Sequence, residues 1–202
     1  MTKNILISSM AQVILIIILA LVCWLIFGKK RQPFLSWIGV IKPEVSRKRL
    51  FIGLFLSGFI LFSAVGWLVF VYFTSPSDVA ASQFYGVGIS GIGAALLYSF
   101  VQTGLSEEIL FRGLIGKRCI AVFGFGVGNS IQSVLFGCLH GLMFLALAGA
   151  ANAVIITIFT ALIGWVMGYM NEKLSGGSIL PSWLLHGLAN LFSTLIMMFQ
   201  LF

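Results

Sequence analysis

The chain has 202 residues, of which 60% are hydrophobic and only 8% charged, and a soluble core of this size cannot bury so much apolar surface. This composition excludes an ordinary soluble domain and indicates an integral membrane protein. The formal net charge of +7 does not indicate nucleic-acid binding, because most of the basic residues gather in one short segment, where contact with anionic lipid head groups explains them.

Six stretches are long and apolar enough to cross a bilayer, whose hydrocarbon core of about 30 Å needs roughly 20 helical residues. Their apolar runs are continuous rather than alternating, which argues against the strands of a membrane β-barrel. We therefore predict an all-α polytopic membrane protein, a bundle of about six transmembrane helices. The predicted helices lie near residues 5–27, 50–73, 84–115, 128–147, 152–171 and 180–201.

The basic segment lies between the first two predicted helices, and the positive-inside rule places it in the cytoplasm. Counting helices from it places the N-terminus and residues 74–78 outside, and Lys117, Arg118 and residues 171–173 inside, in agreement with their charges. The segment contains seven of the twelve Lys and Arg residues, namely Lys29, Lys30, Arg31, Lys42, Arg47, Lys48 and Arg49.

Three glycine pairs have the small-xxx-small spacing that lets helix backbones approach closely. Packing within one chain explains them as well as dimerisation does. The pairs are Gly124/Gly128, Gly137/Gly141 and Gly164/Gly168.

The third predicted helix carries the charged residues Glu107, Glu108 and Arg112. A charged residue near the centre of a membrane helix costs roughly 2.5 to 3.5 kcal/mol on insertion scales. Lys117 marks the cytoplasmic end of the helix, so Glu107 lies about 15 Å inside it at a rise of 1.5 Å per residue. Three such residues require a partner or a function.

Helical phase separates the two glutamates. Glu108 and Arg112 are four residues apart and share a face, whereas Glu107 points about 100° away from Glu108. We expect Arg112 to pair with Glu108 and to leave Glu107 for a partner on another helix. A buried ion network that only holds helices together is the simpler interpretation of these charges.

The two histidines of the chain, His140 and His186, both lie in predicted membrane helices. Asn190 follows His186 by one turn and shares its face, and Phe136 precedes His140 by one turn. Ionisable groups of this kind inside a membrane are functional-site candidates by default.

Three motifs occur in order on different predicted helices: EExxxR as "EEILFR" from Glu107, FxxxH as "FGCLH" from Phe136, and HxxxN as "HGLAN" from His186. This ordered set resembles the CAAX protease and bacteriocin-processing family, also called the Abi family. The resemblance covers residues 84–202, which we expect to form the catalytic core of a single membrane domain. Residues 1–83 would add two helices and the basic loop.

The resemblance implies an intramembrane endopeptidase related to the enzymes that cleave prenylated CAAX proteins. On the matching positions, Glu107 and His140 would activate water, and His186 and Asn190 would stabilise the oxyanion. Glu108, Arg112 and Phe136 would support the site.

The chemistry is reasonable on physical grounds. Amide hydrolysis needs a base that takes a proton from water, and a carboxylate such as Glu107 is a stronger base in an apolar setting than in bulk water. It also needs donors aimed at the developing oxyanion, and the amide of Asn190 and an N–H of His186 can supply them.

A metal is the alternative, because Glu107, His140 and His186 with an open water position could also form a catalytic zinc site. No HExxH sequence is present, and the resemblance favours a glutamate-dependent mechanism with no cofactor. We therefore expect no metal and keep zinc as the alternative.

Two non-proteolytic functions remain open. An immunity protein against a bacteriocin, or a scaffold that binds a sensor kinase or another membrane protein, could keep these residues as a polar packing network. A transporter could also use charges at the membrane midplane, but the chain has no internal repeat.

The expected substrate is a membrane-associated peptide or protein, and the expected location is a prokaryotic cytoplasmic membrane. We expect the lipid bilayer as surroundings, no nucleic acid as partner, and a site that is accessible from the cytoplasmic side.

Overall fold

A computed structural model describes residues 2–73 and 81–201 of the chain, and every regular element among them is a helix. The predicted all-α membrane fold is confirmed, since five helical stretches in this part of the chain are long and apolar enough to cross a membrane. The predicted outside loop at 74–78 lies outside the described residues.

The N-terminal part consists of two long helices joined by the basic loop. Helix α1 (Thr2–Phe27) is followed by the short α2 (Phe34–Ile38) and by α3 (Lys48–Phe73). Only 6% of the most apolar window of α1 is buried inside the protein, compared with 50% for the last helix, α6 (Leu180–Phe199). Helix α1 therefore turns most of its surface to lipid, and α6 lies in the centre of the bundle.

One continuous helical run begins at η3 (Gly88–Gly91), a 3-10 turn, and at α4 (Ile92–Leu96). It continues through two π-helical segments, η4 (Leu97–Leu105) and η5 (Glu108–Gly116), into α5 (Lys117–Tyr169). The π-helical geometry is rare and is often found at functional sites. A third π-helical segment, η6 (Met170–Leu174), follows α5 directly.

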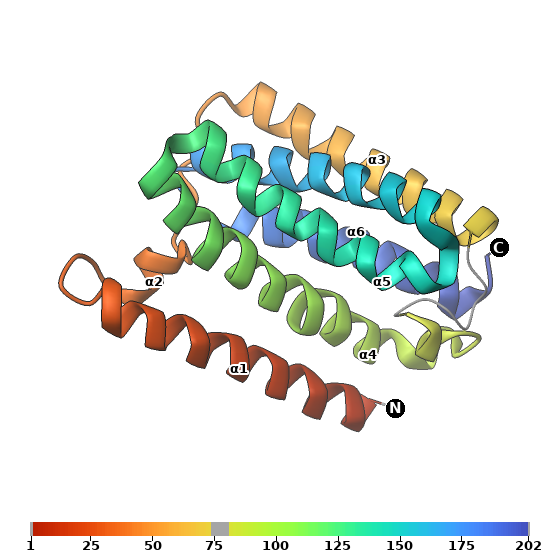
Figure 1. The fold of residues 1–202 in the computed structure, drawn as a ribbon. Helices are drawn as coiled ribbons and strands as arrows, with labels where there is room; N and C mark the ends of the chain where they lie inside the picture. The colour runs from red at the N-terminus through yellow and green to blue at the C-terminus, as the bar shows by residue number, and fades with distance from the viewer. Residues whose placement is uncertain (1, 74–80, 202) are drawn as a thin grey trace.

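Helix α5 is not one straight rod, because Gly124 and Gly149 have left-handed φ angles of 76° and 78°. Glycine adopts such angles without the strain that a Cβ atom would introduce. The chain reverses direction at both places (Figure 1), so α5 is divided among three neighbouring passes of the membrane. We call these passes helices 88–123, 125–148 and 150–174. The apolar stretch Gly88–Ala146 thus crosses twice, and the five apolar stretches make six passes.

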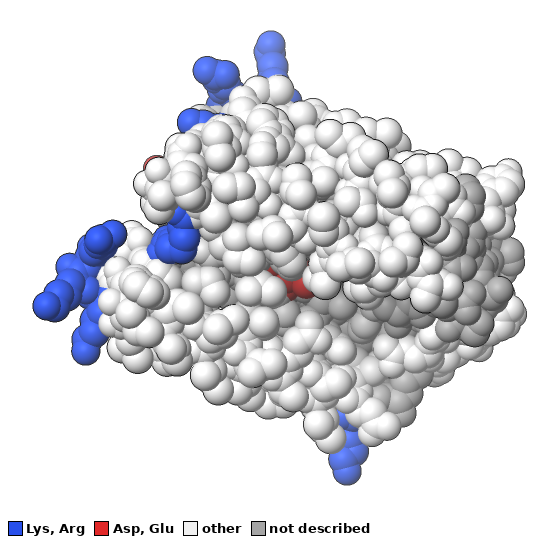
Figure 2. Space-filling view, in the orientation of Figure 1, with Lys and Arg blue, Asp and Glu red and all other residues white. Residues whose placement is uncertain are grey.

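The ends of the bundle differ in charge. Both termini lie at one end, and α2 lies at the other together with the turn near Gly124 and most of the blue side chains (Figures 1 and 2). At this basic end Lys117 Nζ lies 2.8 Å from Glu172 Oε1 and donates to the carbonyl of Gly177 at 2.7 Å. The backbone N–H of Ile179 donates to Gly39 at 2.9 Å, which attaches the basic loop to the start of α6.

Five of the six glycines in the small-xxx-small pairs face another pass of the same chain, and a Cβ atom on Gly128 would meet the backbone of Cys119 and Ile120 on helix 88–123. A Cβ atom on Gly137 or Gly141 would collide with Thr157, and one on Gly164 or Gly168 would collide with side chains of helix 125–148 or with Arg112. Packing within one chain explains these glycines, and Gly124 serves as a turn instead.

This packing predicts opposite effects for two glycines on helix 125–148. Gly141→Ala should destabilise the protein by about 1 to 3 kcal/mol, because the added methyl group meets Thr157 and the carbonyl of Ala153. Gly126→Ala is the matched control, because nothing lies near that position and alanine favours the helix. Melting temperatures in detergent should fall only for Gly141→Ala, and equal values for the two variants would contradict the close packing.

Candidate functional site

Three passes bring the residues of the three motifs to one place. Glu107 lies on helix 88–123, between the π-helical segments η4 and η5, and Glu108 begins η5. His140 lies on helix 125–148, and His186 lies on α6. The structure therefore brings together residues that are far apart in the sequence, at the middle depth of the bundle.

Glu108 is fully buried, and charged or polar groups surround its carboxylate. Arg112 Nη1 lies 3.1 Å from Glu108 Oε1, which confirms the pairing expected from the four-residue spacing. His186 Nδ1 lies 3.0 Å from the same oxygen. The Ser182 hydroxyl donates to Glu108 Oε2. Such compensation is what a buried charge needs, because its desolvation is costly.

Asn171 extends this network to helix 150–174. Its Nδ2 group donates to Ser182 Oγ at 2.6 Å, and its Oδ1 accepts from the backbone N–H of Ser182 at 3.3 Å. The second bond satisfies one of the free N–H groups in the first turn of α6. Sequence reasoning missed both residues, since neither is charged and neither belongs to a motif.

Phe136 contacts three members of the site. Its ring lies under the guanidinium of Arg112, with 4.1 Å between Arg112 Cζ and the ring centroid. The same ring packs on His140 at a centroid distance of 4.4 Å and meets His186 edge-on at 5.8 Å. A cation over an aromatic face is favourable, and more so when both are desolvated. Phe136 thus holds both imidazole rings and Arg112 in place.

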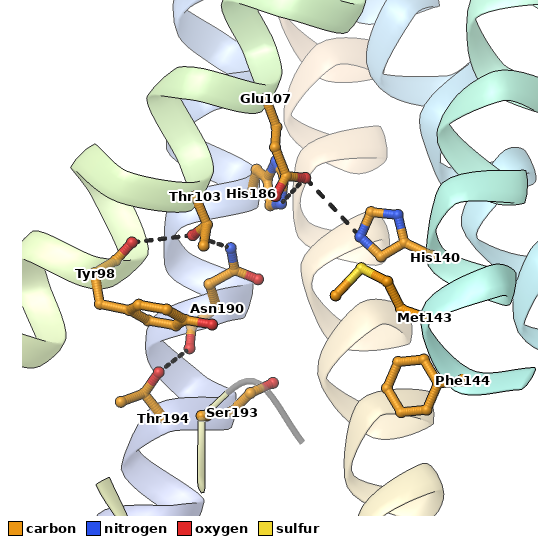
Figure 3. Close-up of a pocket in the computed structure, with 11 residues that line it drawn as sticks. Tyr98, Thr103, Glu107, His140, Met143, Phe144, His186, Asn190, Ser193 and Thr194 are labelled. Atoms are coloured by element: carbon orange, nitrogen blue, oxygen red, sulfur yellow. Dashed lines mark hydrogen bonds and ion pairs between the residues drawn. The ribbon is translucent and has the colours of Figure 1, made fainter. Parts of the chain in front are cut away.

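Glu107 faces both histidines, and its inner oxygen, Oε2, makes no hydrogen bond. Glu107 Oε2 lies 3.9 Å from His140 Nε2 and 3.8 Å from His186 Nε2 (Figure 3). This oxygen is buried and has no hydrogen-bond partner among the described residues. These separations are too long for direct hydrogen bonds, so the three atoms surround a space rather than touch each other.

The outer hydrogen bonds of the two imidazoles decide what faces this space. His140 Nδ1 lies 2.9 Å from the carbonyl oxygen of Phe136, which can only accept, so Nδ1 carries a proton. His186 Nδ1 likewise faces the Glu108 carboxylate. In the neutral rings both Nε2 atoms therefore present lone pairs toward Glu107.

Asn190 is held by Thr103 of η4. The Thr103 hydroxyl donates to the carbonyl of Tyr98 at 3.0 Å, so it accepts from Asn190 Nδ2 at 2.8 Å. This arrangement fixes which end of the Asn190 amide points to Thr103. It leaves one N–H of the amide free for another acceptor. Thr103 is a third residue that sequence reasoning missed, because its bond to a carbonyl in a π-helical segment has no signal in the sequence.

A cavity of about 180 Å³ opens beside Glu107, and the side chains of Figure 3 surround it. Figure 2 shows acidic atoms at the bottom of a hollow in the uncharged middle of this face. The Glu107 side chain is 22% exposed, whereas that of Glu108 is fully buried. The cavity is lined by Ala81, Tyr98, Thr103, Glu107, His140, Met143, Phe144, His186, Asn190, Ser193 and Thr194.

Zinc would need ligands about 2.0 to 2.2 Å from one point. Glu107, His140 and His186 present a carboxylate oxygen and two imidazole lone pairs, which is the chemistry of a zinc donor set. In residues 2–73 and 81–201, however, no group of three or more His, Cys, Asp or Glu side chains is arranged closely enough to hold a metal ion.

A family model described as "Type II CAAX prenyl endopeptidase Rce1-like" matches residues 89–192, which is just over half of the chain. The chain belongs to this Rce1-like family. The matched region contains all three motifs and leaves out the first two long helices. Comparisons with curated proteins and with solved structures give no match. Membership identifies a membrane protein of an intramembrane endopeptidase family.

The different surroundings of the two glutamates predict different stabilities. Glu108→Gln should lower the free energy of unfolding by about 3 to 5 kcal/mol, because it leaves Arg112 without its buried counter-charge. Glu107→Gln is the control for the same chemical change one residue away. It should leave folded yield and melting temperature in detergent nearly unchanged, because its inner oxygen makes no hydrogen bond. Equal losses for both variants would contradict this division.

Proposed function

We propose that the protein is an intramembrane endopeptidase in which Glu107 and His140 activate a water molecule. The observation that supports this most directly is the space between Glu107 Oε2 and the two Nε2 atoms, at 3.9 and 3.8 Å. A water molecule in the adjoining cavity can donate one hydrogen to the Glu107 carboxylate and the other to His140 Nε2, since both residues line it. This water is the nucleophile of the proposed reaction.

In the proposed mechanism Glu107 takes a proton from the water as it attacks the carbonyl carbon of the peptide bond. His140 holds the water from the opposite side, because its Nε2 atom accepts a second hydrogen. The proton then moves to the leaving amine when the carbon–nitrogen bond breaks. The products are a new carboxyl terminus and a new amino terminus, and no other reactant is needed.

We propose that Asn190 and His186 stabilise the oxyanion. Asn190 has one amide N–H that is not used by Thr103. His186 can donate through Nε2 only as an imidazolium, since its Nδ1 faces Glu108. One lost donor of this kind lowers kcat by about 10² to 10³.

The surroundings of the site favour an apolar, membrane-associated substrate. A second cavity of about 150 Å³ shares His140 and Phe144 with the first and is otherwise lined almost entirely by apolar groups, including Phe62 and Phe159. We infer that an apolar side chain or lipid-like group near the cleaved bond occupies it. We place the protein in a prokaryotic cytoplasmic membrane, with peptide precursors or membrane proteins as the substrate class.

A non-catalytic scaffold or immunity protein is the second candidate. The fully buried network of Glu108, Arg112, Ser182 and Asn171 supports it, because these groups join three passes whether or not a bond is cleaved. The cavity beside Glu107 favours the enzyme, because a purely structural network has no need of an open space next to an unpaired carboxylate oxygen.

The proposal predicts that Glu107→Gln abolishes cleavage while the protein stays folded. Peptides from membranes of cells with the wild-type protein should be compared with those from cells with the variant by quantitative proteomics. Glu44→Gln makes the same change on an exposed residue of the basic loop and should keep wild-type products. Full activity in a folded Glu107→Gln protein would refute the catalytic assignment, and identical peptide sets in all three samples would favour the scaffold.

Chelation separates the two forms of the mechanism. Purified protein treated with a strong chelator should keep its cleavage activity and contain less than one equivalent of zinc, because Glu107 and His140 activate water without a metal in the proposed reaction. Activity that is lost on chelation and restored by zinc would assign Glu107, His140 and His186 as metal ligands instead.

A further inference from the structure

An apolar groove lies between the beginning of α3 and the beginning of α6, away from the proposed catalytic residues. Its volume is about 420 Å³, and its lining side chains are aliphatic or aromatic. Among the described residues, none lines both this groove and the cavity beside Glu107. The groove is lined by Pro43, Val45, Phe51, Ile52, Phe55, Leu56, Leu180, Pro181, Trp183 and Leu184.

The walls of the groove are held by the rest of the protein. The rings of Phe51 and Phe55 stack on each other with centroids 6.2 Å apart, and both pack against the buried core that contains Leu185. On the other wall, Trp183 Nε1 donates to the carbonyl of Phe100 at 2.7 Å. The groove is therefore formed before anything enters it, as is usual for apolar ligand sites.

The open side of the groove faces lipid. Its outer edge consists of Ile52, Leu56 and Leu184, which are 54%, 53% and 43% exposed. In a bilayer such side chains contact acyl chains, but this contact is not selective, because lipid tails are as apolar as leucine. The groove can therefore receive an acyl chain, and the choice of lipid depends on the groups at its end.

Positive charges flank the groove at the basic end of the protein. Lys42 directly precedes the lining residue Pro43. Lys48 lies one turn before Phe51 and Ile52, on the face of α3 that lines the groove. Basic side chains project from the protein where α3 begins (Figures 1 and 2). We call four exposed residues the flanking cations, namely Lys42, Arg47, Lys48 and Arg49.

The flanking cations have no acidic partner within the described residues, where none of them makes an ion pair. Other cations at the basic end do have partners. Lys117 pairs with Glu172, and Arg118 and Lys173 lie over aromatic rings. Glu44 is the one acidic residue of the basic loop, and its carboxylate lies beside Gly176. The flanking cations are thus available to an anion from outside the protein.

Hydrogen bonds fix the loop that carries these charges. The backbone N–H of Ser46 donates to the carbonyl of Leu174 at 2.9 Å. Arg47 has a left-handed φ of 48°, which is uncommon for a residue with a side chain, and its carbonyl accepts from the N–H of Phe51 at 3.1 Å. The loop is therefore held at the end of the groove, and the charges stay beside the apolar walls.

We propose that the groove and the flanking cations bind an anionic phospholipid of the leaflet at the basic end, with one acyl chain in the groove and the phosphate at the cations. Basic pockets between transmembrane helices are typical sites for anionic head groups. A lipid fits both parts, whereas a free phosphate leaves the groove empty and a neutral lipid leaves the charges unpaired. This inference goes beyond the proposed function and does not depend on it.

Thermal unfolding in lipid nanodiscs tests the charges. The full chain is placed in phosphatidylcholine, with and without a minor fraction of dioleoyl phosphatidylglycerol. A ligand that binds only the folded state raises the melting temperature, and we expect a rise of roughly 5 °C for the wild type. The triple variant Arg47→Gln, Lys48→Gln, Arg49→Gln should lose at least half of this rise.

The matched control removes three charges from the other side of the same loop, as Lys29→Gln, Lys30→Gln, Arg31→Gln. It should keep the wild-type rise, because these residues follow α1 and do not flank the groove. General attraction to an anionic surface depends on the number of charges and would affect both triple variants alike. Equal rises for the two triple variants, or no rise for the wild type, would overturn the proposal.

A second pair of variants tests the acyl chain. Ile52→Trp fills the groove from an exposed position and should abolish the rise. Ile60→Trp makes the same change on α3, at a position that is 63% exposed and does not line the groove, and should keep it. Each variant is compared with its own melting temperature in pure phosphatidylcholine, so a loss of stability does not obscure the result.

The soluble head group separates the two sources of phosphate. Glycerol 3-phosphate, added to nanodiscs of pure phosphatidylcholine, should leave the melting temperature of the wild type unchanged. A rise as large as that with phosphatidylglycerol, or a full rise for Ile52→Trp, would show an anion site without a seated chain and would overturn the proposal. None of these measurements involves cleavage, so the lipid site and the catalytic assignment can fail separately.

Discussion

The charge of Glu108 is the constraint on which the rest of the site depends. A carboxylate with no exposed surface must be compensated inside the protein, and three passes contribute to this compensation. Arg112 supplies the counter-charge, His186 and Ser182 bond to the two oxygens, and Asn171 holds Ser182. Because the bond to His186 fixes the ring of that histidine, the same interaction that joins the helices also directs His186 Nε2 toward Glu107.

Two neighbouring glutamates thus have different surroundings although they are chemically identical. Glu108 is saturated with partners, whereas Glu107 keeps an oxygen without a hydrogen bond beside an open cavity. A general base needs an oxygen that is free to accept a proton. The network around Glu108 already holds the helices together, so the fold does not need a hydrogen bond from this oxygen of Glu107. Phe136 lies where the two environments meet, since its ring contacts both Arg112 and His140.

Much of this arrangement could be predicted from the sequence, and the parts that could not have a common cause. The hydropathy of the sequence predicts the membrane passes. The four-residue spacing predicts the pairs Glu108–Arg112 and Phe136–His140, because the two residues of each pair lie on one helix. Ser182, Asn171 and Thr103 were not predicted, because their roles depend on contacts between helices. A turn between residues 115 and 128 was predicted, but its position at Gly124 was not, because the helix continues past Lys117 and Arg118 and a single left-handed glycine ends it.

The two π-helical segments on either side of Glu107 have a consequence for the evolution of the chain. A π-helical segment arises when one residue is inserted into an α-helix, and it changes the angular register of all residues on one side. Removal of one residue from η4 would turn Thr103 or Tyr98 relative to Glu107 by about 100°, the angle per residue of an α-helix. The Thr103–Asn190 bond would then be lost even though every motif remained intact. The length of the chain between Tyr98 and Glu107 is therefore under constraint in its own right, and in related chains the same spacing there would carry as much information as the two glutamates.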